Sequence, residues 1–192
     1  MRYVCILYFL LLLSPWAWGQ FAFPALGGRS AGMAGCGTAL TDNGLGNVAA
    51  WGWQKQASVG LSVRNTAMLK ELSYVELFAC LPTREHGAFA LSFDHFGTSV
   101  YHEQRASLAY ALATKRIAIG ARLDYLRSDT SDPHYTPLNQ LSFTAGLQAR
   151  PTYRLSLGAR TEEARLWSLG AAYQLAKELT GTAEVEYYNH HS

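Results

Sequence analysis

The clearest pattern in the chain is an alternation of apolar positions with small or charged positions over residues 116–127. The apolar set is Ile117, Ile119, Ala121, Leu123 and Tyr125, and the set between is Ala118, Gly120, Arg122 and Asp124. Because successive side chains of a β-strand point to opposite faces, the run predicts a two-faced strand. It spans about ten residues, the length that a tilted strand needs to cross the hydrocarbon layer of a membrane.

The same period continues from residue 56 to the end of the chain and predicts an all-β fold. Only one strand is blurred, because Tyr74 and Phe78 share a face with Glu76. The nine predicted strands are 57–64, 72–81, 88–94, 105–112, 116–127, 140–148, 153–160, 167–174 and 182–187.

A soluble lipocalin-like barrel or a sandwich also alternates, so the period alone does not assign the faces. All four lysines, Lys55, Lys70, Lys115 and Lys177, fall between strands, whereas a soluble sheet would spread Lys and Glu along its outward face. Aromatic residues near strand ends resemble the girdles of membrane barrels. These are Tyr110, Tyr125, Tyr153, Trp167, Tyr173 and Tyr187. We therefore expect an antiparallel transmembrane β-barrel with its apolar face toward lipid.

The opposite face of the predicted strands is mostly Gly, Ala, Ser and Thr, which suits a narrow lumen. Its few long side chains carry both signs of charge and are expected to pair across that interior. They are Arg64, Arg105, Arg122, Arg154 and Arg160, with Glu76, Asp94, Asp124, Glu184 and Glu186.

The predicted connections alternate between short and long. Short ones cover 81–86, 113–115, 150–152 and 176–178, and longer ones 65–71, 97–103, 128–137 and 161–165. Membrane barrels have short periplasmic turns and longer outer loops, which places 128–137 outside. Bacterial single-chain barrels have an even number of strands. The odd count therefore predicts a further strand, either from the N-terminal segment or beyond Ser192, where the usual terminal aromatic is absent.

The first 19 residues have the three parts of a secretory signal peptide: a basic head, an apolar run at 4–13 and an exit of small and polar residues. A membrane anchor is the alternative, but that run is shorter than the roughly 20 residues that spanning requires. We expect cleavage before Gln20, then a glycine-rich segment at 20–55 and the barrel at 56–192. Such glycine density predicts bends and close backbone contacts. A flexible leader would normally carry more charge.

Other chemistries find little support. A formal charge of +2, from 16 basic and 14 acidic residues, argues against a nucleic-acid partner. Asp94 and His95 are neighbours on one strand and point to opposite faces, which argues against a catalytic triad. His190 and His191 lack a third ligand for a metal. We expect no enzyme activity, cofactor or metal.

Cys36 and Cys80 are interpreted as small buried residues, with a disulfide as the alternative.

The passage at 27–43, GGRSAGMAGCGTALTDN, followed by Asn47-Val48-Ala49-Ala50, resembles the entry of FadL-like outer-membrane proteins, above all the Bacteroidetes branch with the PorV and PorQ barrels of type IX secretion. The family pattern has Pro and Gly where this chain has Val48 and Ala50. The resemblance implies a barrel of about 14 strands with an N-terminal plug, to which Gly32, Met33, Asn43 and Asn47 would belong.

Two functions follow for a protein of the cell outer membrane. A FadL- or PorV-like barrel would carry hydrophobic small molecules or serve a protein-secretion complex, with membrane lipid and such a ligand or secretion proteins as partners. A narrow OmpA-like barrel would be structural or adhesive, without a transport pathway. Strand number separates them, since about eight to ten strands enclose an interior that side chains fill.

Overall fold

A computed structural model describes residues 32–33, 35–41, 45–65, 68–83, 87–132, 134 and 136–189. The predicted signal peptide, the predicted plug residue Asn43 and the histidine pair at the C-terminus lie outside these residues. All nine predicted strands lie within them.

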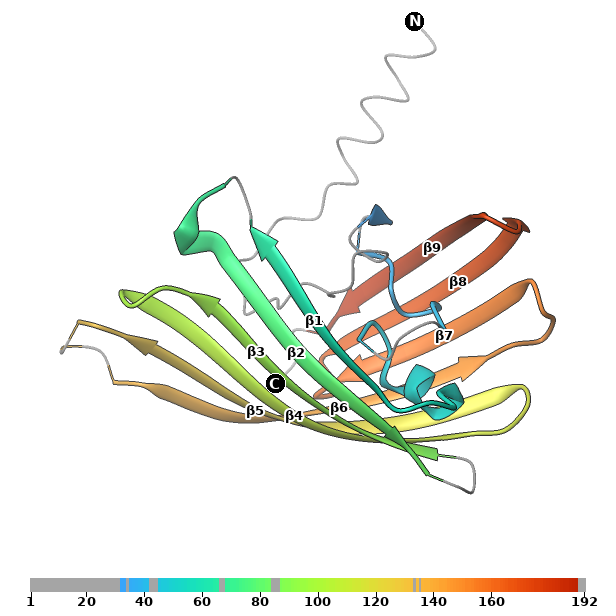
Figure 1. The fold of residues 1–192 in the computed structure, drawn as a ribbon, viewed down its shortest axis with the longest axis horizontal. Helices are drawn as coiled ribbons and strands as arrows, with labels where there is room; N and C mark the ends of the chain where they lie inside the picture. Colours follow the sequence, from blue (N-terminus) through green and yellow to red (C-terminus); the bar gives the residue numbers. More distant parts are fainter. Residues whose placement is uncertain are drawn as a thin grey trace, which may run out of the picture.

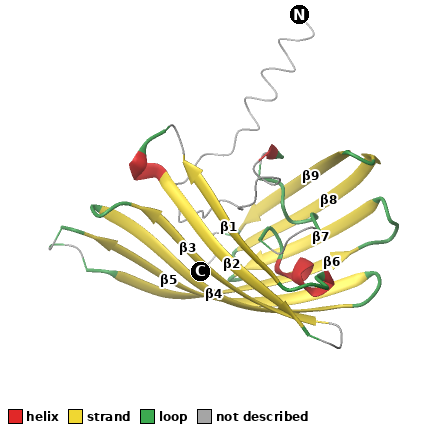
Figure 2. Ribbon diagram, in the orientation of Figure 1, coloured by secondary structure: helices red, strands yellow, loops and turns green. Residues whose placement is uncertain are grey.

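The described residues form one antiparallel sheet of nine strands in sequence order, with two short 3-10 helices, and so confirm the all-β prediction (Figure 1, Figure 2). The 3-10 helices are η1 (Val48–Trp53) and η2 (Lys70–Leu72). The strands are β1 (Ser58–Asn65), β2 (Ser73–Pro82), β3 (Gly87–Gly97), β4 (Tyr101–Ala113), β5 (Ile117–Thr130), β6 (Leu138–Ala149), β7 (Leu155–Glu162), β8 (Leu166–Ala176) and β9 (Leu179–Tyr188).

The sheet curves into a trough, and residues 35–41 and 45–53, here called the inner segment, lie over its concave side (Figure 1). Within the described residues, β1 pairs only with β2 and β9 only with β8. These two strands are therefore the edges of an open sheet.

The two faces of the sheet are those that the alternation predicts. Large apolar side chains on the convex face are exposed, whereas alanines, serines and the ionisable residues of the inner strands are buried on the concave face. The alternation is blurred in β2 because Phe78, an apolar residue on the concave face, packs against Trp51 of the inner segment. The two ring centroids are 5.5 Å apart. Val48, Trp51, Cys80 and four alanines of β3 and β4 form the main apolar cluster there. Cys80 and Cys36 are free thiols, the first buried and the second half-buried.

The expected strict alternation of short and long connections is wrong. Residues 98–100 and 163–165 are tight turns, as short as the turn at 114–116. Gly97 has a φ of 98°, and Glu163 and Ala164 have φ values of 51° and 57°, so left-handed residues close both turns. We call the end of the sheet with the β2–β3, β4–β5, β6–β7 and β8–β9 connections the turn end, and the opposite end the loop end.

The predicted start of the seventh strand is also too early. Strand β7 begins at Leu155, and residues 151–154 are bends of the preceding connection, in which the Leu155 amide donates to the Thr152 hydroxyl (3.1 Å). Tyr153 and Arg154 therefore precede the strand. No helix among the described residues has the length and apolar character to cross a membrane.

Candidate functional site

The inner segment rests in a groove made by four glycines of neighbouring strands, here called the glycine groove. Gly120 of β5 lies opposite Gly146 of β6, and Gly158 of β7 lies opposite Gly170 of β8. A Cβ atom at Gly158 would stand 1.9 Å from the carbonyl oxygen of Thr38, and one at Gly120 would stand 2.9 Å from the backbone nitrogen of Ala49. Only a residue without a side chain permits so close a backbone approach.

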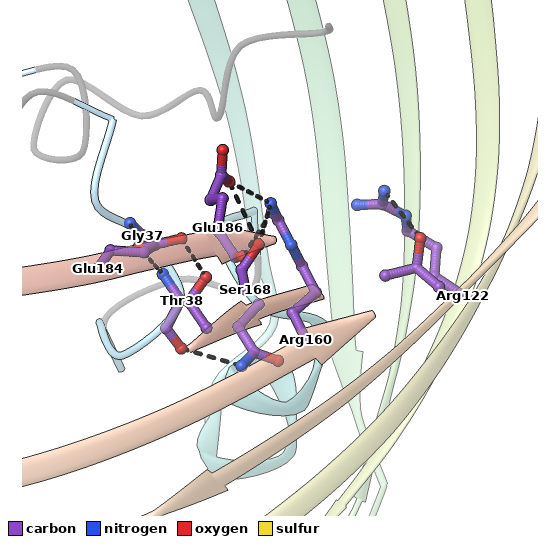
Figure 3. Close-up of polar contacts among 10 residues, drawn as sticks. Gly37, Thr38, Arg122, Arg160, Ser168, Glu184 and Glu186 are labelled. Carbon is purple, nitrogen blue, oxygen red and sulfur yellow. Dashed lines mark hydrogen bonds and ion pairs between the residues drawn. The ribbon is translucent and has the colours of Figure 1, made fainter. Parts of the chain in front are cut away.

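Two side chains of the sheet hold the first half of the inner segment. The Glu184 carboxylate on β9 accepts hydrogen bonds from the amides of Gly37 (2.9 Å) and Thr38 (3.0 Å) and from the Thr38 hydroxyl (Figure 3). On β6, the Gln148 amide nitrogen donates to the carbonyl oxygens of Thr38 and Leu40, at 2.8 Å each. The part-buried Glu184 contacts are charge-assisted, and such hydrogen bonds are among the stronger ones in proteins.

Asn47 organises the second half of the inner segment. Its side-chain oxygen accepts from the Ala49 amide (3.1 Å) and so caps η1. Its side-chain nitrogen lies within hydrogen-bond distance of three carbonyl oxygens, those of Thr38 (2.9 Å), Leu147 (3.2 Å) and Ala159 (3.2 Å). Asn47 therefore ties the two halves of the inner segment to each other and to strands β6 and β7.

The other half of the concave face carries five ionisable residues of neighbouring strands, Glu76, Asp94, Arg105, Arg122 and Asp124, here called the charged cluster. Arg105 Nε donates to Asp94 Oδ2 at 2.6 Å, and Arg122 Nε binds the Asp124 carboxylate at 2.9 Å. The Ser107 hydroxyl donates to Asp124 Oδ1. Glu76 lies directly opposite Asp94 in the β2–β3 register. Three carboxyl groups thus share two guanidinium groups in a buried region.

Most of the predicted lumen charges lie on the concave face. Their partners include backbone carbonyl and hydroxyl groups as well as opposite charges. Arg160 donates to the Gly46 carbonyl (3.0 Å) and to the Ser168 hydroxyl (3.3 Å), near the Glu186 carboxylate (3.5 Å). Two predicted members take no part in these contacts. Arg64 is exposed on edge strand β1, and Arg154 is exposed with its guanidinium 5.1 Å from the Tyr153 ring. The prediction that Arg154 belongs to a strand is wrong.

The predicted plug residues also differ in their surroundings. Asn47 is the centre of the docked inner segment. Met33 packs against Ala39, Leu40 and Ala172, whereas Gly32 has open space around its Cα.

Sequence reasoning missed Gln148, Arg150 and the glycine groove. A glycine inside a strand pattern often marks close backbone approach, so the four glycines were a usable signal. Their alignment across four strands becomes visible only once the register is known.

The concave face offers little for catalysis within the described part of the chain. Asp94 binds Arg105, and the His95 ring lies 5.9 Å from the His102 ring, so Asp94 and His95 do not share a site. No group of three or more His, Cys, Asp or Glu side chains among the described residues is arranged to hold a metal ion. What the arrangement can do is bind the chain's own backbone and keep charges paired away from solvent.

Comparisons with models of protein families, with curated proteins and with solved structures found no match for this chain.

Proposed function

We propose that the chain is an outer-membrane β-barrel protein of the FadL or PorV type, in which the inner segment is the plug. One observation carries the proposal, namely the continuous exposed apolar convex face of a sheet whose polar residues point inward. Soluble proteins rarely expose contiguous apolar patches larger than a few hundred Å². Lipid is the medium in which such a face is stable, and the exposed tyrosines and tryptophan on it suit the headgroup region.

In lipid, the edges of the sheet require partners, because unpaired backbone groups there are costly. Nine antiparallel strands in succession leave β1 and β9 running in the same direction. Closure of these two edges on each other would create a parallel pair, whereas an odd number of further strands between them would close the barrel with antiparallel pairs throughout. The FadL-like proposal contains such strands.

The proposed activity is passage of hydrophobic small molecules, or service to a protein-secretion complex, with the plug controlling the interior. The second candidate, a narrow structural barrel of the OmpA type, is favoured by the dense filling of the concave face. The inner segment and the charged cluster together leave the residues beneath them buried. Such filling is expected of a barrel with few strands.

Reconstitution tests both candidates. The purified chain is compared boiled and unboiled on a gel, then inserted into liposomes for solute leak and for binding of a fluorescent fatty acid. Fatty-acid binding or leak supports the first candidate. A heat-modifiable, inserted protein with neither property supports the second. A chain that stays in the aqueous phase without detergent contradicts both.

A charged substitution on the convex face tests whether that face contacts lipid or water. Leu123 in the middle of β5 and Ile117 at its start are equally exposed, at 50% and 51%. In a bilayer, Leu123→Arg is expected to cost about 2–4 kcal/mol of unfolding free energy and Ile117→Arg about 0–1 kcal/mol, because the cost falls toward the interface. Urea unfolding of the liposome-inserted variants measures both. Equal and small costs would identify the convex face as a water-exposed surface.

A further inference from the structure

Positive charge is concentrated at the turn end of the sheet. The described residues there include six cationic side chains and one carboxylate, Glu178. The cations are Lys55, Lys115, Arg116, Arg150, Arg154 and Lys177. None of the six forms an ion pair with a carboxylate of the described residues. A rim of this kind attracts anions.

Three of these cations line one open pocket at the turn end. Lys55, Lys115 and Arg150 share it with Trp53 and with Thr83 of the β2–β3 connection. These residues come from four separate stretches of the chain, brought together where the inner segment leaves the trough. The other three cations lie outside the pocket lining.

Trp53 and Arg150 of the pocket lining are held by contacts within the chain. The Trp53 indole nitrogen donates to the Thr114 carbonyl at 2.9 Å, which holds the ring in place. The Arg150 guanidinium lies 3.8 Å from the centre of that ring, and its Nη2 atom donates to the Thr41 carbonyl at 3.3 Å. Stacking on the ring orients the planar guanidinium and leaves several of its five N–H donors for a ligand.

Arg150 is half-buried without a counter-charge among the described residues. Burial lowers the pKa of its guanidinium, and no carboxylate opposes that effect. Arginine stays charged all the same. A desolvated cation of this kind gains more from an anionic ligand than an exposed lysine does.

We propose that this pocket binds a phosphate-bearing anion. Arg150 supplies the planar fork that matches two phosphate oxygens, and Lys55 and Lys115 of the same pocket lining supply point charges. Two sources share this chemistry, an anionic phospholipid headgroup at the membrane surface and a free phosphate or phosphate ester in solution. Binding of free phosphate requires no membrane insertion, so this proposal and the proposed function fail separately.

The test uses the full mature chain in non-ionic detergent with two probes. Calorimetry measures binding of inorganic phosphate, and native mass spectrometry compares retention of phosphatidylglycerol with that of phosphatidylcholine. The Lys115 side chain is exposed and forms no hydrogen bond or ion pair with the described residues, so Lys115→Gln is the main variant, with Arg150→Gln as the second. We expect Arg150→Gln to weaken binding about tenfold or more, the usual effect of losing a charged hydrogen bond. Lys115→Gln is expected to weaken it by about fivefold, because the charge of the exposed lysine is solvated. Lys177→Gln removes the same charge at the same end, outside the pocket, and is expected to change binding less than about twofold.

Preferential retention of phosphatidylglycerol that depends on Lys115 supports the site and identifies a lipid headgroup. Phosphate binding that depends on Lys115, without preference between the lipids, supports the site and identifies a soluble phosphate. If Lys177→Gln and Lys115→Gln weaken binding equally, the binding comes from the overall positive charge of the turn end, and the site is overturned. Absence of binding of either probe by the unmodified chain also overturns it.

Discussion

Gly158→Val is expected to release the inner segment from the trough. The new Cβ would meet the Thr38 carbonyl oxygen at 1.9 Å, the Thr38 carbonyl carbon at 2.6 Å and the Ala39 Cα at 3.0 Å. All three are backbone atoms, so no side-chain rotation relieves the clash. Overpacking commonly costs about 1–3 kcal/mol where side chains can give way, and a rigid backbone places this case at the upper end or beyond.

Release would separate the Thr38 region from Glu184 and Gln148, whose hydrogen bonds end there. Hydrogen–deuterium exchange at residues 37–41 measures this directly. A loss of about 3 kcal/mol in docking free energy speeds exchange there by roughly a hundredfold. Gly181→Val is the matched control, because a Cβ at Gly181 meets only the end of the Leu175 side chain, at 3.7 Å.

A second readout tests whether the inner segment leaves as one unit. Cys80 of β2 is buried in one apolar cluster with Val48 and Trp51. These two residues belong to the half of the inner segment that lies away from Gly158. In a Cys36→Ser background, alkylation of Cys80 reports whether that half has also lifted. If Gly158→Val leaves both the amides at 37–41 protected and Cys80 unreactive, the inner segment does not lie in the glycine groove.

The sequence predicts the faces of this sheet well because the period of two is a local property of each strand. Alternation alone placed Glu76, Asp94 and Glu184 on the same side as the glycines and serines, and the structure has them there. The one blurred strand, β2, proved informative. Its apolar inward residue Phe78 marks where the inner segment adds an apolar surface to an otherwise small and polar face.

The contacts of the site could not be predicted from the sequence, because they depend on the strand register and on pairs of residues far apart in the chain. Glu184 binds an amide 147 residues earlier in the chain, and nothing in the local pattern around either residue selects the other. The wrong prediction that Arg154 lies in a strand has a local cause. The alternation runs on through the turn before β7, so the pattern alone does not show that the strand begins only at Leu155.

Arg105→Met is expected to destabilise the folded sheet by about 3–5 kcal/mol, the usual cost of removing one partner of a buried ion pair. The Arg105 and Asp94 side chains are only 11% and 0% exposed. Without the guanidinium, Asp94 would lose its ion-pair partner while it lies opposite the Glu76 carboxyl group in the β2–β3 register. Urea unfolding monitored by tryptophan fluorescence measures the change in unfolding free energy.

The matched control for Arg105→Met is Arg127→Met, which breaks the Arg127–Asp129 pair near the end of β5. That pair is solvated, with the Arg127 and Asp129 side chains 48% and 22% exposed, and is expected to contribute far less to stability than the buried pair. The double variant Arg105→Met/Asp94→Leu removes both buried charges and should regain much of the lost stability, because an uncompensated charge, rather than a missing attraction, dominates the single variant. Equal costs for Arg105→Met and Arg127→Met, or a double variant no more stable than Arg105→Met, would contradict a desolvated ion pair on the concave face.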